Sequence, residues 1–182
     1  MPPRTIAIKE TELNPFGGNG NSVIGTPWSV FKPLNDRFNF TLDVCAVAEN
    51  TKVKNYLTGP CIKTYRPCHC GLCTEWGSNV CWMNPPYTRG QIELWIDKAI
   101  KQAEKGATVV ALTHLACSSQ WARQALKSSH LQELMLVYPR IQFDNAGVQN
   151  ARDSMLLVFS STYQVDSEIN TWIPTKFWTW QK

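Results

Sequence analysis

The run Asn84-Pro85-Pro86-Tyr87 constrains the fold more than any other feature, because it directly follows the apolar residues 80–83. Those apolar residues predict a buried strand. Two prolines cannot extend a strand, since each lacks a backbone N–H and has a fixed φ. The strand therefore ends in a stiff turn that presents an amide oxygen, backbone carbonyls and an aromatic ring, a set that suits a planar ring with an amino group. The alternative interpretation is an ordinary Asn-Pro turn followed by a core tyrosine.

The composition predicts an ordinary globular domain. The chain has 182 residues, of which 43% are hydrophobic and 18% charged, and this balance excludes a disordered protein. Its net charge of +4 permits binding to a polyanion without requiring it. No apolar run approaches the ~20 residues of a membrane span, and the first residues lack the apolar core of a signal peptide. With seven cysteines, an odd number, we expect a reducing, cytoplasmic location with thiols or a metal site rather than disulfides.

Hydrophobic periodicity predicts alternating strands and helices, which favours an α/β fold with a mostly parallel sheet. Pro33 should shorten or kink the first helix. The segment between the last two strands is too short for a helical crossover, so these strands should form an antiparallel C-terminal pair. We expect strands near 40–46, 80–83, 108–113, 134–138 and 154–159, and helices near 26–38, 48–57, 92–103 and 118–128.

Two polar residues stand where predicted strands end. The first strand ends near Asp43, and Asn84 directly follows the second. Ligands of parallel sheets bind beyond the carboxyl ends of the strands. We therefore expect both side chains on the same rim of the domain, although they are 41 residues apart in the chain.

Three regions are expected along the chain. Residues 1–25 are polar and glycine-rich and should form a flexible arm. Residues 26–160 should form the main domain, with a cysteine-rich insertion at about 58–78. Residues 161–182 carry three tryptophans and two lysines. We expect this aromatic tail to pack on the domain, and the alternative is that its rings stack on a nucleic-acid strand.

The insertion contains a cluster of thiols. Cys61, Cys68, Cys70 and Cys73 fall within thirteen residues, and the last two form a Cys-x-x-Cys pair. This spacing suits a tetrahedral zinc ion, and four sulfur ligands so close together in an intracellular protein favour metal over disulfides. We therefore expect a structural zinc site. The alternative is a surface loop with unmodified thiols.

Several motifs in a fixed order give the chain a family resemblance. It resembles the phage-type DNA N6-adenine methyltransferases, the small Dam-like family of phages and prophages, over residues ~26–159. Several motifs in the right order are far more specific than any one of them. The stretches that carry the resemblance are Thr26-Pro27-Trp28, residues 42–46, Glu49-Asn50, Trp76, the 84–87 turn with the helix after it, residues 140–143, Asn150 and Ser154.

The resemblance implies an enzyme with a Rossmann-like methyltransferase fold, S-adenosylmethionine as cofactor and DNA as partner. We expect no membrane association, because no apolar run is long enough, and no obligate protein partner. In the 84–87 turn, Asn84 and Pro85 would hold the amino group of adenine, Pro86 would fix the turn, and Tyr87 would stack on the base. A bacterial cytoplasm, with a phage or prophage origin, would be the place of action.

The same resemblance assigns a cofactor site. Thr26, Pro27 and Trp28 match a segment at the cofactor's amino-acid end, and Asp43, Ala46 and Asn50 match the first cofactor-binding strand and loop. The chain departs from the wider methyltransferase pattern, because residues 43–46 lack the glycine-rich turn of most relatives outside this family. The acidic residue that would hold the cofactor's ribose is not identified, and Glu49 and Glu75 are both candidates.

The turn also indicates a mechanism. Hydrogen bonds from the adenine amine to Asn84 Oδ1 and to the Pro85 carbonyl would favour a nitrogen closer to tetrahedral and stabilise the positive charge that develops on it. The base would have to leave the duplex to reach the turn. The same turn suits cytosine N4 or a protein glutamine amide as the methylated group. A different class of function is an inactive methyltransferase fold that serves as a zinc-containing nucleic-acid-binding module.

Overall fold

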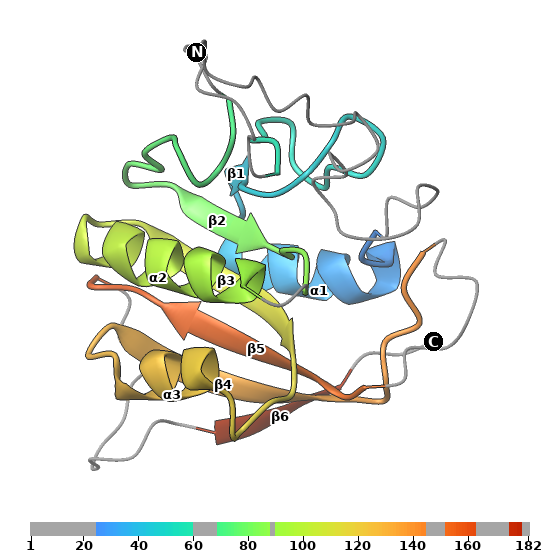
Figure 1. Cartoon of the computed structure of the whole chain (residues 1–182). Coiled ribbons are helices and arrows are strands. Elements are labelled where there is room, and N and C mark those ends of the chain that lie inside the picture. The colour runs from blue at the N-terminus through green and yellow to red at the C-terminus, as the bar shows by residue number, and fades with distance from the viewer. Residues whose placement is uncertain (1–24, 60–68, 88–89, 145–151, 163–174, 180–182) are drawn as a thin grey trace, which may run out of the picture.

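One mixed β-sheet organises the protein (Figure 1). The computed structural model of the chain describes residues 25–59, 69–87, 90–144, 152–162 and 175–179. Within these residues the sheet has six strands in the spatial order β1-β2-β3-β5-β4-β6. The strands are β1 (Leu42–Asp43), β2 (Val80–Met83), β3 (Thr108–His114), β4 (Leu131–Tyr138), β5 (Ser154–Phe159) and β6 (Thr175–Thr179).

The strand directions confirm an α/β fold and the expected antiparallel C-terminal pair. Strands β1, β2 and β3 run parallel to one another, and β5 is antiparallel to both β3 and β4. The pair is therefore not appended to the edge, because β5 inserts between β3 and β4. Every residue of β5 is buried, as expected for a strand covered on both faces.

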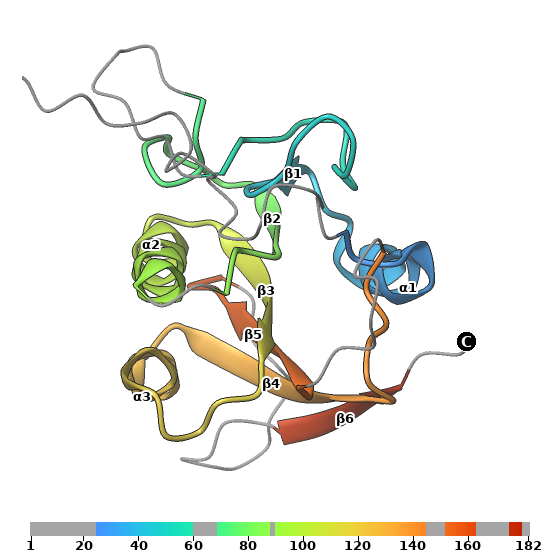
Figure 2. The ribbon, with the colours of Figure 1, turned by 45° about the vertical axis from the view of Figure 1, so that its right-hand side comes forward.

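The two faces of the sheet are covered by different helices (Figure 2). Helices α2 (Gln91–Glu104) and α3 (Gln120–Lys127) lie on one face, and α1 (Trp28–Phe38) lies on the other. Each face has its own core: one includes Trp95 and Trp121, and the other includes Phe31 and Trp82. None of the described helices is long and apolar enough to cross a membrane.

Helix α1 continues through Pro33, so of the two expected effects the shortening is wrong, and a kink at this residue stays a prediction. Pro33 lies in the sixth position of an eleven-residue helix, and its side chain is exposed. An interior proline costs about 3 kcal/mol. The helix buries four apolar side chains, and each contributes about 1.5–3 kcal/mol, which outweighs that loss. These side chains are Val30, Phe31, Leu34 and Phe38.

The predicted helix at 48–57 is also wrong. Residues 48–50 instead form a turn, and the end of the segment pairs in parallel with β1 at Tyr56. Hydrogen bonds run from Asp43 N to Asn55 O (2.9 Å) and from Leu57 N to Asp43 O (2.8 Å). The Asn50 side chain accepts the N–H of Val47 at 2.8 Å. Asparagine and aspartate side chains that bind nearby backbone N–H groups compete with helix formation. The chain is thereby folded over the end of β1.

Strand β6 was not expected from the sequence. It pairs in parallel with β4, from Leu134 opposite Thr175 to Tyr138 opposite Thr179. Trp178 is half-buried and packs against the core on the α1 side of the sheet. The expected N-terminal arm, residues 1–24, lies outside the described part of the chain, as do residues 163–174 and 180–182.

Candidate active site

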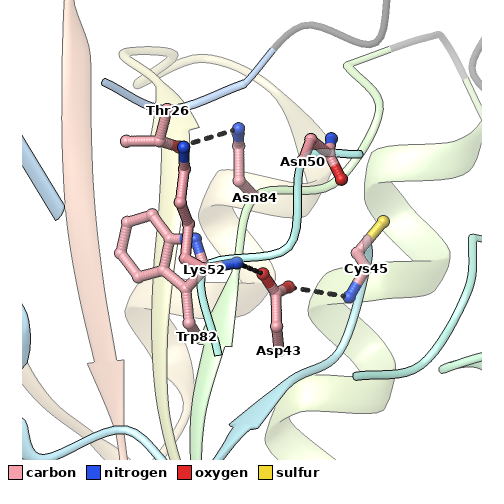
Figure 3. Close-up of a pocket in the computed structure, with 7 residues that line it drawn as sticks. All are labelled: Thr26, Asp43, Cys45, Asn50, Lys52, Trp82 and Asn84. Atoms are coloured by element: carbon pink, nitrogen blue, oxygen red, sulfur yellow. Dashed lines mark hydrogen bonds between the residues drawn. The ribbon is translucent and has the colours of Figure 1, made fainter. Parts of the chain in front are cut away.

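The carboxyl ends of β1 and β2 form one rim with a small pocket (Figure 3). Asp43 is the last residue of β1, and Asn84 directly follows β2. The sequence prediction that these two residues share a rim is thus confirmed. Five of the seven side chains around the pocket are polar, and the full set is Thr26, Asp43, Cys45, Asn50, Lys52, Trp82 and Asn84.

Asp43 places a buried carboxylate in this pocket. Only 3% of the residue is exposed. Its two oxygens accept the N–H of Cys45 at 3.3 Å and the N–H of Lys52 at 3.1 Å. Burial raises the pKa of Asp43 from 3.8 to about 6, and the two N–H groups offset part of the rise. The carboxyl group is therefore ionised at neutral pH and keeps lone pairs for a ligand.

Asn84 has its carboxamide held at both ends. Its Nδ2 donates to Thr26 Oγ1 at 3.1 Å, and its Oδ1 accepts the Tyr87 hydroxyl at 2.7 Å. The two lengths match N–H···O and O–H···O bonds respectively, which supports this orientation of the amide. A carbonyl oxygen accepts two hydrogen bonds. Asn84 Oδ1 therefore has capacity for one more donor.

Tyr87 is packed against the protein interior. Its ring meets the His114 ring edge-on, with centroids 5.4 Å apart, and burial raises the pKa of its hydroxyl. The hydroxyl also lies 3.1 Å from the Leu112 carbonyl. Because a tyrosine has one hydroxyl proton, it donates fully to only one of these two acceptors at a time. In this structure Tyr87 thus acts as a partner of Asn84, and stacking on a base stays a prediction.

The residues assigned to the cofactor by resemblance occupy different places. Thr26, Asp43 and Asn50 line the pocket. The other three do not line it: Pro27 is the N-cap of α1, Trp28 is 59% exposed at the start of that helix, and Ala46 is buried with its N–H bonded to the Leu57 carbonyl.

Lys52 is a pocket residue that the sequence did not single out. Its side chain is only 7% exposed, and its Nζ lies 3.7 Å from Asp144 Oδ2. The same ammonium stands 4.7 Å from the centre of the Trp28 ring. From the sequence, a lysine in a polar loop is expected to point into solvent. Its inward orientation is evident only from its contacts with Trp28 and Asp144, which lie in distant segments of the chain.

The two candidate ribose ligands are both outside the pocket lining. Glu49 is exposed. Glu75 accepts hydrogen bonds from Lys105 at 2.8 Å and Gln102 at 2.9 Å, both on or beside α2. The hydrogen bond from Lys105 is the largest influence that lowers the pKa of Glu75, to about 2. Glu75 thus connects the segment before β2 to the C-terminal end of α2 through these hydrogen bonds.

The proposed zinc ligands are only partly described. Cys61 and Cys68 lie outside the described residues. Cys70 is buried and Cys73 is exposed. Among the residues that the structure describes, no group of three or more His, Cys, Asp or Glu side chains is placed to hold a metal ion. A zinc site made by all four cysteines stays a prediction.

Comparison with known proteins gives two matches, and the first spans the pocket and the 84–87 turn. Residues 21–173 match the family described as DNA N-6-adenine-methyltransferase (Dam). A protein of Haemophilus phage HP1 (strain HP1c1), named DNA N-6-adenine-methyltransferase, is 33% identical to the chain over 142 residues. That alignment covers 74% of this chain and 76% of the phage protein.

Proposed function

The chain belongs to the Dam family of DNA N-6-adenine methyltransferases, and on this premise we propose how its residues carry out the reaction. The activity is transfer of a methyl group to N6 of adenine in DNA. We propose that the donor is S-adenosylmethionine, bound at the rim of a Rossmann-like methyltransferase fold, and that the enzyme acts in the bacterial cytoplasm, where its DNA substrate lies. The observation that carries the proposal is the position of Asn84 beside the pocket that contains Asp43.

The pocket suits one end of this cofactor. S-adenosylmethionine supplies a methyl group on a sulfonium, which is already a strong electrophile. The cofactor carries a positive sulfur and a positively charged amino group. Asp43 provides a buried carboxylate, and a carboxylate in a site of low dielectric attracts such cations strongly. Thr26 and Asn50 add polar groups to the same lining. We assign these three residues to cofactor binding.

Asn84 and Pro85 act on the adenine amine. Its lone pair is delocalised into the ring, so the amine is a poor nucleophile. When its two N–H groups donate to Asn84 Oδ1 and to the Pro85 carbonyl, the nitrogen is drawn toward tetrahedral geometry and its developing positive charge is stabilised. The Tyr87 hydroxyl keeps its hydrogen bond to Asn84 Oδ1, and the amine takes the second acceptor position of that oxygen. No side chain has to remove a proton before methyl transfer.

The base reaches this turn only after it leaves the duplex. Unpairing and unstacking cost a few kcal/mol. Stacking on an aromatic ring returns roughly 1–3 kcal/mol per base, and we assign that role to Tyr87 with Pro86 as the rigid support of the turn.

Product analysis tests the proposal. The purified chain is incubated with DNA and methyl-labelled S-adenosylmethionine, and the DNA is digested to nucleosides and separated with mass detection. We expect the label in N6-methyladenine. Label in N4-methylcytosine, or in a glutamine side chain of an added protein, would contradict the assignment of adenine to this pocket. No label in any product, from a chain that binds the cofactor, would contradict the assignment of Asn84 to catalysis.

A further inference from the structure

We propose that Lys52 binds the carboxylate at the amino-acid end of S-adenosylmethionine. The inference rests on the proposed function, in which the rim pocket holds the cofactor. It concerns a residue in the loop after β1 that none of the sequence motifs includes, and it defines which end of the cofactor faces this pocket.

The Lys52 side chain is mostly buried, and its ammonium group is only partly compensated by the protein. The side chain is 7% exposed and lines the pocket. The nearest carboxylate oxygen, Asp144 Oδ2, is 3.7 Å away, which is beyond hydrogen-bond length. Among the described residues, no acceptor forms a hydrogen bond with Nζ. The Trp28 ring, 4.7 Å from Nζ to its centre, adds a cation–π attraction that uses none of the three N–H donors.

Such an arrangement favours an anionic ligand. A buried charge is costly unless it is paired and hydrogen-bonded. Asp144 is about half exposed, at 47% of its side chain, and a pair of this kind contributes little. An anion that enters the pocket would give Lys52 the hydrogen bonds that the protein does not supply.

The neighbouring charges favour the carboxylate of a zwitterion over a DNA phosphate. The pocket contains one buried carboxylate, on Asp43, and one buried ammonium, on Lys52. The amino-acid end of the cofactor carries the complementary pair, an amino group and a carboxylate. A phosphate is bound instead by exposed lysines that follow the outside of the duplex, whereas the Lys52 side chain lies in a small pocket beside Thr26 and Asn84.

The test compares two ligands that differ by the carboxylate alone. Titration calorimetry measures the affinity of the chain for S-adenosylhomocysteine and for S-adenosyl-3-thiopropylamine, which lacks the carboxylate. The variants are Lys52→Met, which keeps the length of the side chain without its charge, and Lys54→Met. Lys54 is exposed, so its substitution makes the same change in net charge outside the pocket.

We expect Lys52→Met to weaken S-adenosylhomocysteine binding about 10- to 100-fold, the range for a charge-assisted hydrogen bond. Its affinity for the thiopropylamine should stay within about twofold of wild type, and Lys54→Met should match wild type with both ligands. Equal weakening for both ligands, or none for either, would overturn the role of Lys52. If wild type binds neither ligand, the proposed cofactor site itself is wrong.

Wild type provides the same comparison without a substitution. It should bind S-adenosylhomocysteine about 10- to 100-fold more tightly than the thiopropylamine, and Lys52→Arg should keep most of that preference. Equal affinity of wild type for the two ligands would overturn the proposal even if Lys52→Met fails to fold.

Discussion

Substitution of Asp43 by asparagine should change how the stability of the protein depends on pH. Burial raises the pKa of Asp43 from 3.8 to about 6. The folded protein therefore binds this proton more tightly than the unfolded chain does. The carboxyl group thus adds stability below pH ~4, and that stability is lost as the pH rises through about 6.

The size of the effect follows from the two pKa values. A rise from 3.8 to about 6 corresponds to about 3 kcal/mol of unfolding free energy. Other carboxyl groups also contribute to the dependence of stability on pH: Asp153, for example, has its pKa lowered by its hydrogen bond with Arg140. The difference between wild type and Asp43→Asn cancels those contributions, because the asparagine does not titrate.

Urea denaturation without cofactor measures this difference. Unfolding free energies are determined for both proteins from pH 4 to pH 7.5. The wild-type value minus the Asp43→Asn value should fall by about 2 kcal/mol between pH 4 and pH 7, because part of the ~3 kcal/mol is already lost at pH 4, just above the unfolded pKa of 3.8. A difference that is constant across this range would refute the reasoning, because it would mean that Asp43 has the same pKa in the folded and unfolded states.

Three further outcomes are expected. Tyr87→Phe should lower the unfolding free energy by about 1–3 kcal/mol, since it removes the one hydroxyl proton that Asn84 Oδ1 and the Leu112 carbonyl share. It should slow methyl transfer while S-adenosylhomocysteine affinity stays at wild-type level. Equal loss of rate and affinity would speak against its action through Asn84. Gly71→Ala should destabilise the protein by about 3 kcal/mol, because a Cβ there would clash with the Val44 carbonyl and stand 2.8 Å from the Trp95 ring. Thermal or urea unfolding measures the loss, and unchanged stability would show that the neighbouring groups move aside without cost. The cysteine cluster should hold about one zinc per chain by elemental analysis, with loss of stability on chelation, and a zinc content near zero would end that idea.

The elements with strong local signals were predictable from the sequence. The amphipathic pattern of α2 and the apolar runs of β2 and β5 gave nearly the observed bounds. The failures have long-range causes. Strand β6 forms because β4 offers an edge 41 residues earlier in the chain, and the segment at 48–57 is drawn along β1 by hydrogen bonds to Asp43. Pairing between segments far apart in the chain produces no hydrophobic periodicity, so a single sequence does not reveal it.

The site was predictable to a similar degree. Asn84 and Asp43 were placed on one rim by topology alone, since parallel strands end at the same edge. The inward orientation of Lys52 depends on Trp28 at the start of α1 and on Asp144 beyond β4. The hydrogen bond from Tyr87 to Asn84 depends on the packing of the tyrosine ring against His114. Neither contact leaves a pattern that a single sequence reveals.

The most direct test of the account is the rate of one methyl-transfer turnover by Asn84→Ala. Enzyme in excess over DNA, saturated with labelled S-adenosylmethionine, is followed by quenched flow for label in N6-methyladenine. We expect a rate at least about 100-fold below that of wild type, with affinity for S-adenosylhomocysteine close to wild type. The melting temperature should fall by only a few degrees, because the lost hydrogen bonds to Thr26 and Tyr87 are each modest contributions. A turnover rate equal to that of wild type would show that the carboxamide of Asn84 does not hold the reacting amine.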